Sequence, residues 1–272
     1  MRGVNITTDR ISNSRTHQKD SQIKFYNKRF SEIDRALTRL VEPNLSYDRR
    51  LMEKILDESK NQKDSTLLEI CAGQGIEGIL LSENASLVIC SDISIGALKV
   101  AKDLAKIYKK TNIELIQCDA EFLPFRNNIF DLSFGKDALH HVTEPIFVLK
   151  EMQRCSKKFS KIIVIEANPL NPQMALIGLI YFNVDKGVFQ NNENNLKRYF
   201  QSANLSNIDI KYAEFLPRSI LFYVSSPLLK LINKYPLLNK LLLKINIVEQ
   251  KIEKIKYAQK FSNFLIVSGT KR

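Results

Sequence analysis

Cysteine is scarce in this chain of 272 residues, and its spacing excludes the common metal and disulfide frameworks. The four cysteines, Cys71, Cys90, Cys118 and Cys155, form no C-x-x-C pair and lie mostly within apolar runs. Such spacing is typical of reduced core thiols in a cytoplasmic protein rather than of a disulfide frame or a zinc site. We therefore expect structural roles for all four thiols and no metal centre.

Long uncharged apolar runs are also lacking. The run at 169–184 has 16 residues, among them two prolines and two asparagines, whereas a membrane-spanning helix needs about 20 apolar residues. The first two dozen residues are polar, without the charged start and apolar stretch of a signal peptide. We expect a cytoplasmic protein with a flexible arm at 1–24, peripheral at most at the inner face of a membrane.

Acidic residues are outnumbered, since 29 Asp and Glu stand against 41 Lys and Arg, a formal net charge of +12. Most of the excess is C-terminal: residues 218–272 hold eleven basic and two acidic residues. A basic balance points to a polyanionic partner, either nucleic acid or an anionic lipid surface. With 44% hydrophobic and 26% charged residues, the chain has the composition of a folded globular protein.

The pattern along the chain predicts an α/β fold. Residues 25–62 carry apolar residues at helical spacing, broken by Pro43, and predict a helical cap. Within a core at 63–168, short apolar runs alternate with longer helical stretches, which predicts a doubly wound, mostly parallel sheet. The expected core strands are 66–71, 86–91, 113–118, 130–134 and 161–165.

The last part, 169–272, departs from that rhythm. Two more strands are expected at 207–215 and 263–270. This final pair has no obvious crossover helix in strict βαβ rhythm, so we expect it to form an antiparallel hairpin that completes seven strands. A leucine-rich, lysine-studded stretch at 225–257 would be a helical insertion in that hairpin. The apolar run at 169–184 and the leucine-rich stretch are predicted either to form a lid over the acceptor or to lie on an anionic membrane face.

A glycine-rich loop raises the question of which nucleotide the core holds. Gly73, Gly75 and Gly78 form a literal G-x-G-x-x-G, and Asp92 follows Gly73 by 19 residues. A carboxylate at that distance binds the ribose hydroxyls of a dinucleotide and of S-adenosylmethionine alike. Glu69 discriminates by charge, because it would repel a pyrophosphate but stabilise an ammonium and a sulfonium. The expected ligand is therefore cationic.

Further motifs extend the pattern. The segments "EICAGQG" (69–75), "DAEFLPF" (119–125) and "FDLSFGKDALHH" (130–141) follow one another at fixed spacing. In this order they resemble the class I, Rossmann-like S-adenosylmethionine-dependent methyltransferases of the small-molecule type, over about residues 65–168. Cys71 departs from the family, which usually has glycine there. Together with Asp92, these segments make four motifs in the right order, which is a specific pattern, whereas the glycine pattern alone is weak.

The resemblance implies S-adenosyl-L-methionine as the cofactor and gives each motif residue a role. Glu69 would hold the methionine ammonium and Asp92 the ribose hydroxyls, while Asp119 would take the adenine amino group. Tyr26 resembles a cap tyrosine that closes over the cofactor, with a core aromatic as the alternative. The remaining positions implied to line the cofactor are Ala72, Gly73, Gly75, Ile93, Ala120, Glu121, Gly135 and Lys136.

Methyl transfer is an in-line displacement, so the protein must align the acceptor and, for a hydroxyl or phenol, remove its proton. His140 and His141, which follow the fourth strand, are candidate bases, or else one of them orients a loop; Asp137 and Glu166 are lesser candidates. The acceptor remains open. A small or lipid- or glycan-linked molecule leads. The alternatives are RNA or another nucleic acid, less favoured because no N/D-P-P-Y/F segment follows the fourth strand, and a non-enzymatic membrane-associated binding protein.

Overall fold

The structure is a computed structural model that describes residues 64–180, 186–214 and 255–272 continuously. It also describes 44–57, single or short stretches between 19 and 40, and isolated positions between 237 and 252. The stretch predicted as a helical insertion, 225–257, lies mostly outside the described residues.

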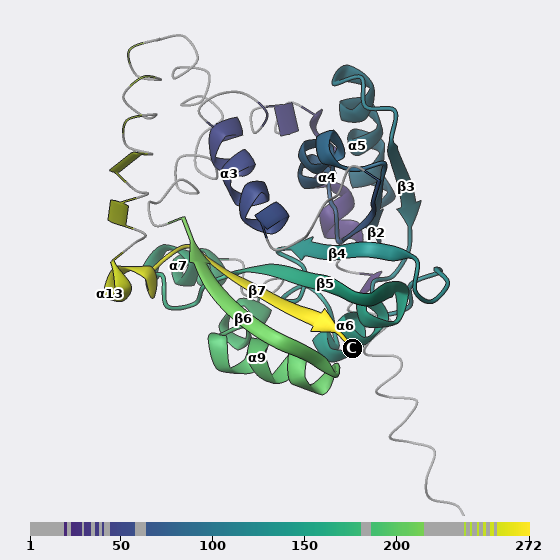
Figure 1. Cartoon of the computed structure of the whole chain (residues 1–272). Coiled ribbons are helices and arrows are strands. Elements are labelled where there is room, and N and C mark those ends of the chain that lie inside the picture. The colour runs from purple at the N-terminus through teal and green to yellow at the C-terminus, as the bar shows by residue number, and fades with distance from the viewer. Residues whose placement is uncertain are drawn as a thin grey trace, which may run out of the picture.

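A single seven-stranded sheet in the order β3-β2-β1-β4-β5-β7-β6 forms the centre of the molecule (Figure 1). The first five strands are parallel, and β7 runs antiparallel to both β5 and β6. The strands are β1 (Thr66–Ile70), β2 (Leu87–Asp92), β3 (Ile113–Gln117), β4 (Phe130–Lys136), β5 (Ser156–Ala167), β6 (Leu205–Ala213) and β7 (Phe264–Lys271).

The central strands β1 and β4 are buried on both faces, which explains their largely apolar sequences, whereas the edge strands β3 and β6 are partly exposed. Leu67 belongs to one hydrophobic cluster and its neighbour Leu68 to the other, because successive side chains of a strand point to opposite faces. Ile163 and Val164 divide in the same way on β5. The sheet thus separates two cores.

Helices cover each face (Figure 1). The first core lies under α3 (Asn44–Asp57), α4 (Ile76–Leu81) and α5 (Ile95–Ile107), and the second under α6 (Pro145–Cys155) and α9 (Glu193–Ser202). Shorter elements are η1 (Ser82–Asn84), α7 (Pro172–Ile180), η2 (Lys186–Gln190) and α13 (Lys256–Gln259). The doubly wound sheet and its antiparallel C-terminal hairpin are as predicted.

One helix between the fifth strand and the hairpin was not predicted from the sequence. Helix α9 lies between β5 and β6 and is capped by Asn192, whose side chain accepts a hydrogen bond from the N–H of Asn195. Leu196 and Phe200, four residues apart, are its buried face. The signal was present in the sequence, but two apolar anchors in a ten-residue polar helix are easily missed beside the long apolar runs around it.

Candidate functional site

The candidate site lies at the edge of the sheet where the parallel strands end. Strand order reverses at β1, which has β2 on one side and β4 on the other. In open α/β sheets, ligands bind outside the carboxyl ends of the strands at such a reversal. The carboxyl ends of β1, β2 and β4 and the loops after β1, β2, β3 and β4 carry most of the residues that the sequence singled out.

The glycine-rich loop after β1 has left-handed backbone at every second residue. Cys71 has φ 49°, Gly73 φ 52° and Gly75 φ 66°, a region that glycine enters without cost and that strains a side-chain-bearing residue. A Cβ atom on Gly75 would lie 3.1 Å from Cβ of Ala101 on α5. Cys71 therefore has the left-handed backbone that a glycine would enter without cost.

Asp92, the last residue of β2, holds this loop in place. Its Oδ2 accepts a hydrogen bond from the N–H of Gly73 at 2.7 Å, and its Oδ1 accepts from the N–H of Ser94 at 2.7 Å. Burial raises the pKa of the Asp92 carboxyl, and those two N–H groups counteract part of the rise. The carboxylate is thus fixed beside the glycines, where the sequence predicted a ribose ligand.

Glu69 lies on β1 beneath α4 and is fully buried. Its Oε2 accepts from Sγ of Cys90 at 3.1 Å, and the N–H of Gly78 also donates to its carboxylate. Burial, and next the carboxylate of Glu77, raise the pKa of Glu69 well above its usual range. Glu77 itself is bonded to Nζ of Lys136, at 3.0 Å. Two acidic side chains, Glu69 and Glu77, thus stand here against one basic side chain, Lys136.

The loop after β3 carries a second acidic group. Asp119 and Glu121 both accept hydrogen bonds from Nζ of Lys19, the latter at 3.0 Å. Glu121 Oε1 also accepts the N–H groups of Thr143 and Glu144, at 2.9 and 3.1 Å, which ties this loop to the one after β4. The ammonium of Lys19 therefore forms ion pairs with both of the carboxylates that were implied to face the adenine.

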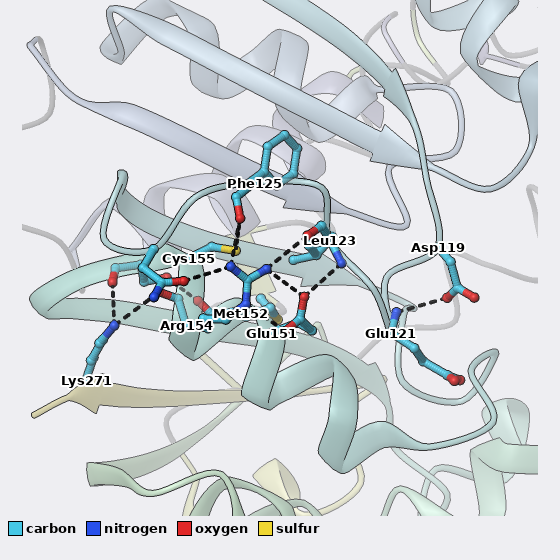
Figure 2. A network of polar contacts seen from close by, with 11 residues as sticks. Asp119, Glu121, Leu123, Phe125, Glu151, Met152, Arg154, Cys155 and Lys271 are labelled. Atoms are coloured by element: carbon cyan, nitrogen blue, oxygen red, sulfur yellow. Dashed lines mark hydrogen bonds and ion pairs between the residues drawn. The ribbon is translucent and has the colours of Figure 1, made fainter.

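A network of polar contacts fixes the same loop from below (Figure 2). The guanidinium of Arg154, at the end of α6, donates to the carbonyl oxygens of Leu123 and Phe125 at 2.9 and 2.7 Å and to Glu151. Glu151 in turn accepts the N–H of Leu123 at 2.9 Å. Asp119 and Glu121 thus project from a loop whose backbone is held rigidly on α6.

The N-terminal cap crosses the same edge. Nε2 of Gln74, in the glycine-rich loop, donates to the carbonyl oxygens of Phe30 and Glu32, both at 3.1 Å. Oδ1 of Asn27 accepts from Oγ of Ser94 at 2.7 Å. Sequence reasoning missed these anchors, as it missed Lys19, because polar contacts between distant segments leave no local pattern.

The two histidines after β4 have different partners. Nδ1 of His140 lies 2.7 Å from Oε2 of Glu166, whereas Nδ1 of His141 lies 2.6 Å from the hydroxyl of Tyr26 in the cap. The two imidazole rings are 3.8 Å apart between centroids. Asp137, with a left-handed φ of 51°, stands beside them. Burial raises the pKa of the Asp137 carboxyl, and Lys136 counteracts part of that rise.

The predicted site residues therefore meet at one edge, with two qualifications. Gly135 has a packing role, because a Cβ there would lie 2.7 Å from Cγ1 of Ile70. Lys136 reaches back to Glu77 on α4. The other predicted positions, Ala72, Ile93 and Ala120, lie in the loops that carry the acids. Within the described residues, no group of three or more potential metal ligands occurs.

The fold and this acidic, glycine-lined edge define a Rossmann-like domain of the methyltransferase class. Residues 68–164 match a family model described as a methyltransferase domain. A demethylmenaquinone methyltransferase of Paenarthrobacter aurescens is 32% identical over 125 residues, 46% of this chain and 46% of the relative. The ubiquinone/menaquinone biosynthesis C-methyltransferase UbiE of Xanthomonas oryzae pv. oryzae is 34% identical over 104 residues, 37% of this chain and 41% of that protein.

Solved structures agree on the fold. Geranyl diphosphate C-methyltransferase from Streptomyces coelicolor, determined with S-adenosyl-L-homocysteine, aligns with a TM-score of 0.58 and 14% identity over 82% of this chain and 78% of its own. Residues 68–164 thus form a methyltransferase domain of the class I, Rossmann-like, S-adenosylmethionine-dependent type. The chain spans about half the length of the curated relatives it matches first.

Proposed function

We propose that this protein transfers a methyl group from S-adenosyl-L-methionine to a small, lipid-like acceptor. The observation that carries the proposal is the Asp92 carboxylate bonded to the N–H of Gly73 at 2.7 Å, at the reversal point of the sheet. This places an acid and a left-handed glycine loop side by side, the arrangement needed to receive a ribose and the methionine carboxylate. Asp119 and Glu121 extend the cradle toward the adenine.

Charge favours this cofactor over a dinucleotide. Glu69, Glu77 and Asp92 surround the loop and only Lys136 offsets them among the charged groups described there. A pyrophosphate would be repelled by this excess of acid, whereas the ammonium and sulfonium of S-adenosylmethionine are attracted by it. The raised pKa of Glu69 also indicates a cationic ligand, because a buried ionised carboxylate is destabilised unless a cation lies beside it.

The acceptor class rests on the relatives. One relative of the core is named a demethylmenaquinone methyltransferase and another a ubiquinone/menaquinone biosynthesis C-methyltransferase, a name that specifies methylation at carbon. We therefore propose an aromatic ring with a lipid tail as the acceptor, methylated at carbon. His140 or His141, which stand together at the carboxyl end of β4, would accept the proton that the acceptor loses.

A second part of the proposal concerns the surface from which such an acceptor arrives. Helix α7 exposes Leu176, Leu179 and Ile180 by 54, 60 and 65%, although apolar side chains of this size are usually buried. Asn171 ties the start of α7 to the carbonyl oxygen of Phe261, at 2.6 Å, and α13 lies beside α7 in Figure 1. Phe261 is 51% exposed as well.

Exposed lysines lie on both sides of α13 in the sequence. Lys260 follows α13, and the described positions Lys240, Lys244 and Lys251 are exposed too. Apolar side chains among lysines are typical of a surface that rests on an anionic bilayer. We propose that α7 and the residues around α13 contact such a bilayer peripherally. Among the described residues, no helix has the length and apolar character to cross it.

A transfer assay tests the activity. The purified protein is incubated with methyl-labelled S-adenosylmethionine and, in separate reactions, with a prenylated demethylated quinol, a tailless quinol and total RNA. We expect label in the prenylated quinol above all. Label in RNA alone would overturn the acceptor class but leave the cofactor standing, and failure to bind S-adenosylmethionine would overturn the activity itself.

A further inference from the structure

Glu166 is a buried acid whose contacts exceed those needed for packing. It lies near the end of β5 and is 0% exposed. Its Oε1 accepts the backbone N–H groups of Ala138 and Leu139, at 3.0 and 2.7 Å. Its Oε2 lies 2.7 Å from Nδ1 of His140 and accepts from Nδ2 of Asn191 at 3.0 Å. All four partners are nitrogen atoms that can carry a hydrogen, and an ionised carboxylate, which can only accept, requires such donors.

These contacts decide the protonation of His140. Because an ionised carboxylate can only accept, the nitrogen facing it must carry hydrogen, and the proton of a neutral imidazole is then held at Nδ1. Burial raises the pKa of Glu166, but His140 and the donors around it outweigh burial and lower the pKa below its usual value. Glu166 therefore stays ionised near neutral pH.

Asn191 and Gly187 connect this pair to the predicted acceptor region. Gly187, in η2, packs so closely that a Cβ atom there would lie 2.3 Å from the carbonyl oxygen of His140. Asn191 follows η2 directly and bonds to the same carboxylate oxygen as His140. One carboxylate thus fixes both the loop after β4 and the segment that covers it.

We propose that Glu166 is a positioning residue that fixes His140 as the Nδ1–H tautomer, so that Nε2 is the nitrogen that accepts the acceptor's proton. This inference rests on the proposed methyl transfer and deepens it by choosing between the two histidines. His141 pairs its Nδ1 with the Tyr26 hydroxyl, which can either donate or accept and therefore does not select a tautomer as a carboxylate does.

The step balances in atoms and charge. The bond between the acceptor and the methyl carbon forms as the bond from that carbon to sulfur breaks, and the electron pair of the broken bond stays on sulfur. The proton that the acceptor loses goes to Nε2 of His140. The resulting imidazolium is stabilised by the carboxylate of Glu166, which remains ionised throughout.

Substitution Glu166→Gln tests the tautomer directly. The amide oxygen is expected to keep the place of Oε1, because two backbone N–H groups point there. The amide NH₂ group then faces Nδ1 of His140 and donates to it, which moves the imidazole proton to Nε2. Fold and cofactor site remain, but the tautomer inverts.

The readout is two-bond ¹H–¹⁵N correlation of the histidine rings at pH 8, without acceptor. The chain has three histidines, and His140→Asn assigns the signal. We expect a protonated Nδ1 and an unprotonated Nε2 in the natural protein, the reverse in Glu166→Gln, and the natural tautomer in the control Asn191→Ala. Protonation of His140 at Nε2 in the natural protein, or an unchanged tautomer in Glu166→Gln, would overturn the inference.

Turnover gives a second, separable readout. Once an acceptor is found, Glu166→Gln should lower kcat by about 100-fold or more with little change in the affinity for S-adenosylmethionine, as expected for a wrongly protonated base. A kcat within about threefold of the natural protein would contradict the role. If the natural protein does not bind S-adenosylmethionine at all, the proposed function is refuted, but the tautomer result still stands.

Discussion

Asp92 shows how one side chain serves both structure and ligand binding. Its carboxylate accepts hydrogen bonds from the N–H groups of Gly73 and Ser94. Removing the carboxylate therefore disturbs the glycine-rich loop as well as any contact with a ribose. Charge-assisted hydrogen bonds are worth about 1.5–3 kcal/mol each. The position was predictable from the sequence, but its double role was not.

We predict that Asp92→Ala weakens S-adenosylmethionine binding by at least about 100-fold, since two such bonds to the ribose are lost. Asp92→Asn, which keeps one oxygen to accept from Gly73, separates loop disorder from ligand loss and should still bind at least about tenfold more weakly. Calorimetric titration measures both, with the exposed Asp103 on α5, changed to alanine, as the matched control. A loss below about threefold in Asp92→Ala would show that Asp92 is not the ribose ligand.

Glu69 leads to a prediction about stability and pH. Its folded-state pKa is raised well above the usual value, by burial first and by Glu77 second. A raised pKa means that the folded protein binds the proton more tightly than the unfolded chain does. Stability therefore falls as pH rises from the unfolded pKa toward the folded one, and a difference of one between the two pKa values corresponds to about 1.4 kcal/mol.

We predict that Glu69→Gln raises Tm at pH 7 by several degrees while it weakens S-adenosylmethionine binding, because it removes a buried charge that only a cation compensates. The gain in Tm should shrink as pH falls toward the unfolded pKa, where the natural glutamate is protonated as well. Thermal unfolding between pH 5 and 8 checks this, with the exposed Glu114→Gln as control. A lower Tm at pH 7, or unchanged cofactor affinity, would contradict the account.

At the scale of elements, α7 differs from the helices that cover the sheet. Helix α5 buries one face and exposes charged residues on the other, whereas α7 buries only Met174 and Gly178 and exposes three large apolar residues. An exposed apolar patch of this kind marks an interaction site. The apolar run at 169–184 predicted a lid or an interfacial segment, and the exposure of α7 favours the second.

We predict that the protein co-sediments with vesicles that contain anionic lipid, not with neutral vesicles, and that salt releases it, because each lysine near the surface contributes about 1 kcal/mol. The double variant Leu176→Ser with Leu179→Ser should bind at least about tenfold more weakly. Ile107→Ser, which changes an exposed apolar residue on the distant α5, is the matched control. Equal binding to both vesicle types, or no effect of the double variant, would contradict the membrane contact.

Seen as a whole molecule, the fold follows from local patterns and the site only in part. Leu67 and Leu68 already show a strand buried on both faces, and the motif acids Glu69, Asp92 and Asp119 lie at or near strand ends because the parallel sheet gathers its loops at one edge. Lys19 and Asp119 are in contact although they are 100 residues apart in the sequence. This contact depends on how the N-terminal segment packs on the sheet, which no local sequence pattern specifies.

The contacts of Glu166, beside the second core, could not be predicted from the sequence either. Glu166 was recognisable as an acid at a strand exit, but its four donors come from the loop after β4 and from Asn191, 25 residues away. Only the assembled molecule brings them together. Sequence motifs of this fold therefore identify the class of ligand, while the positioning of the reacting groups is a property of the tertiary structure.

The choice of cofactor is tested most directly by calorimetric titration of the purified protein with S-adenosylmethionine and, separately, with NAD. The acids around the glycine-rich loop, Glu69, Glu77 and Asp92, predict binding of S-adenosylmethionine and of S-adenosylhomocysteine with no measurable heat from NAD. Clear binding of NAD without any response to S-adenosylmethionine or S-adenosylhomocysteine would contradict the account.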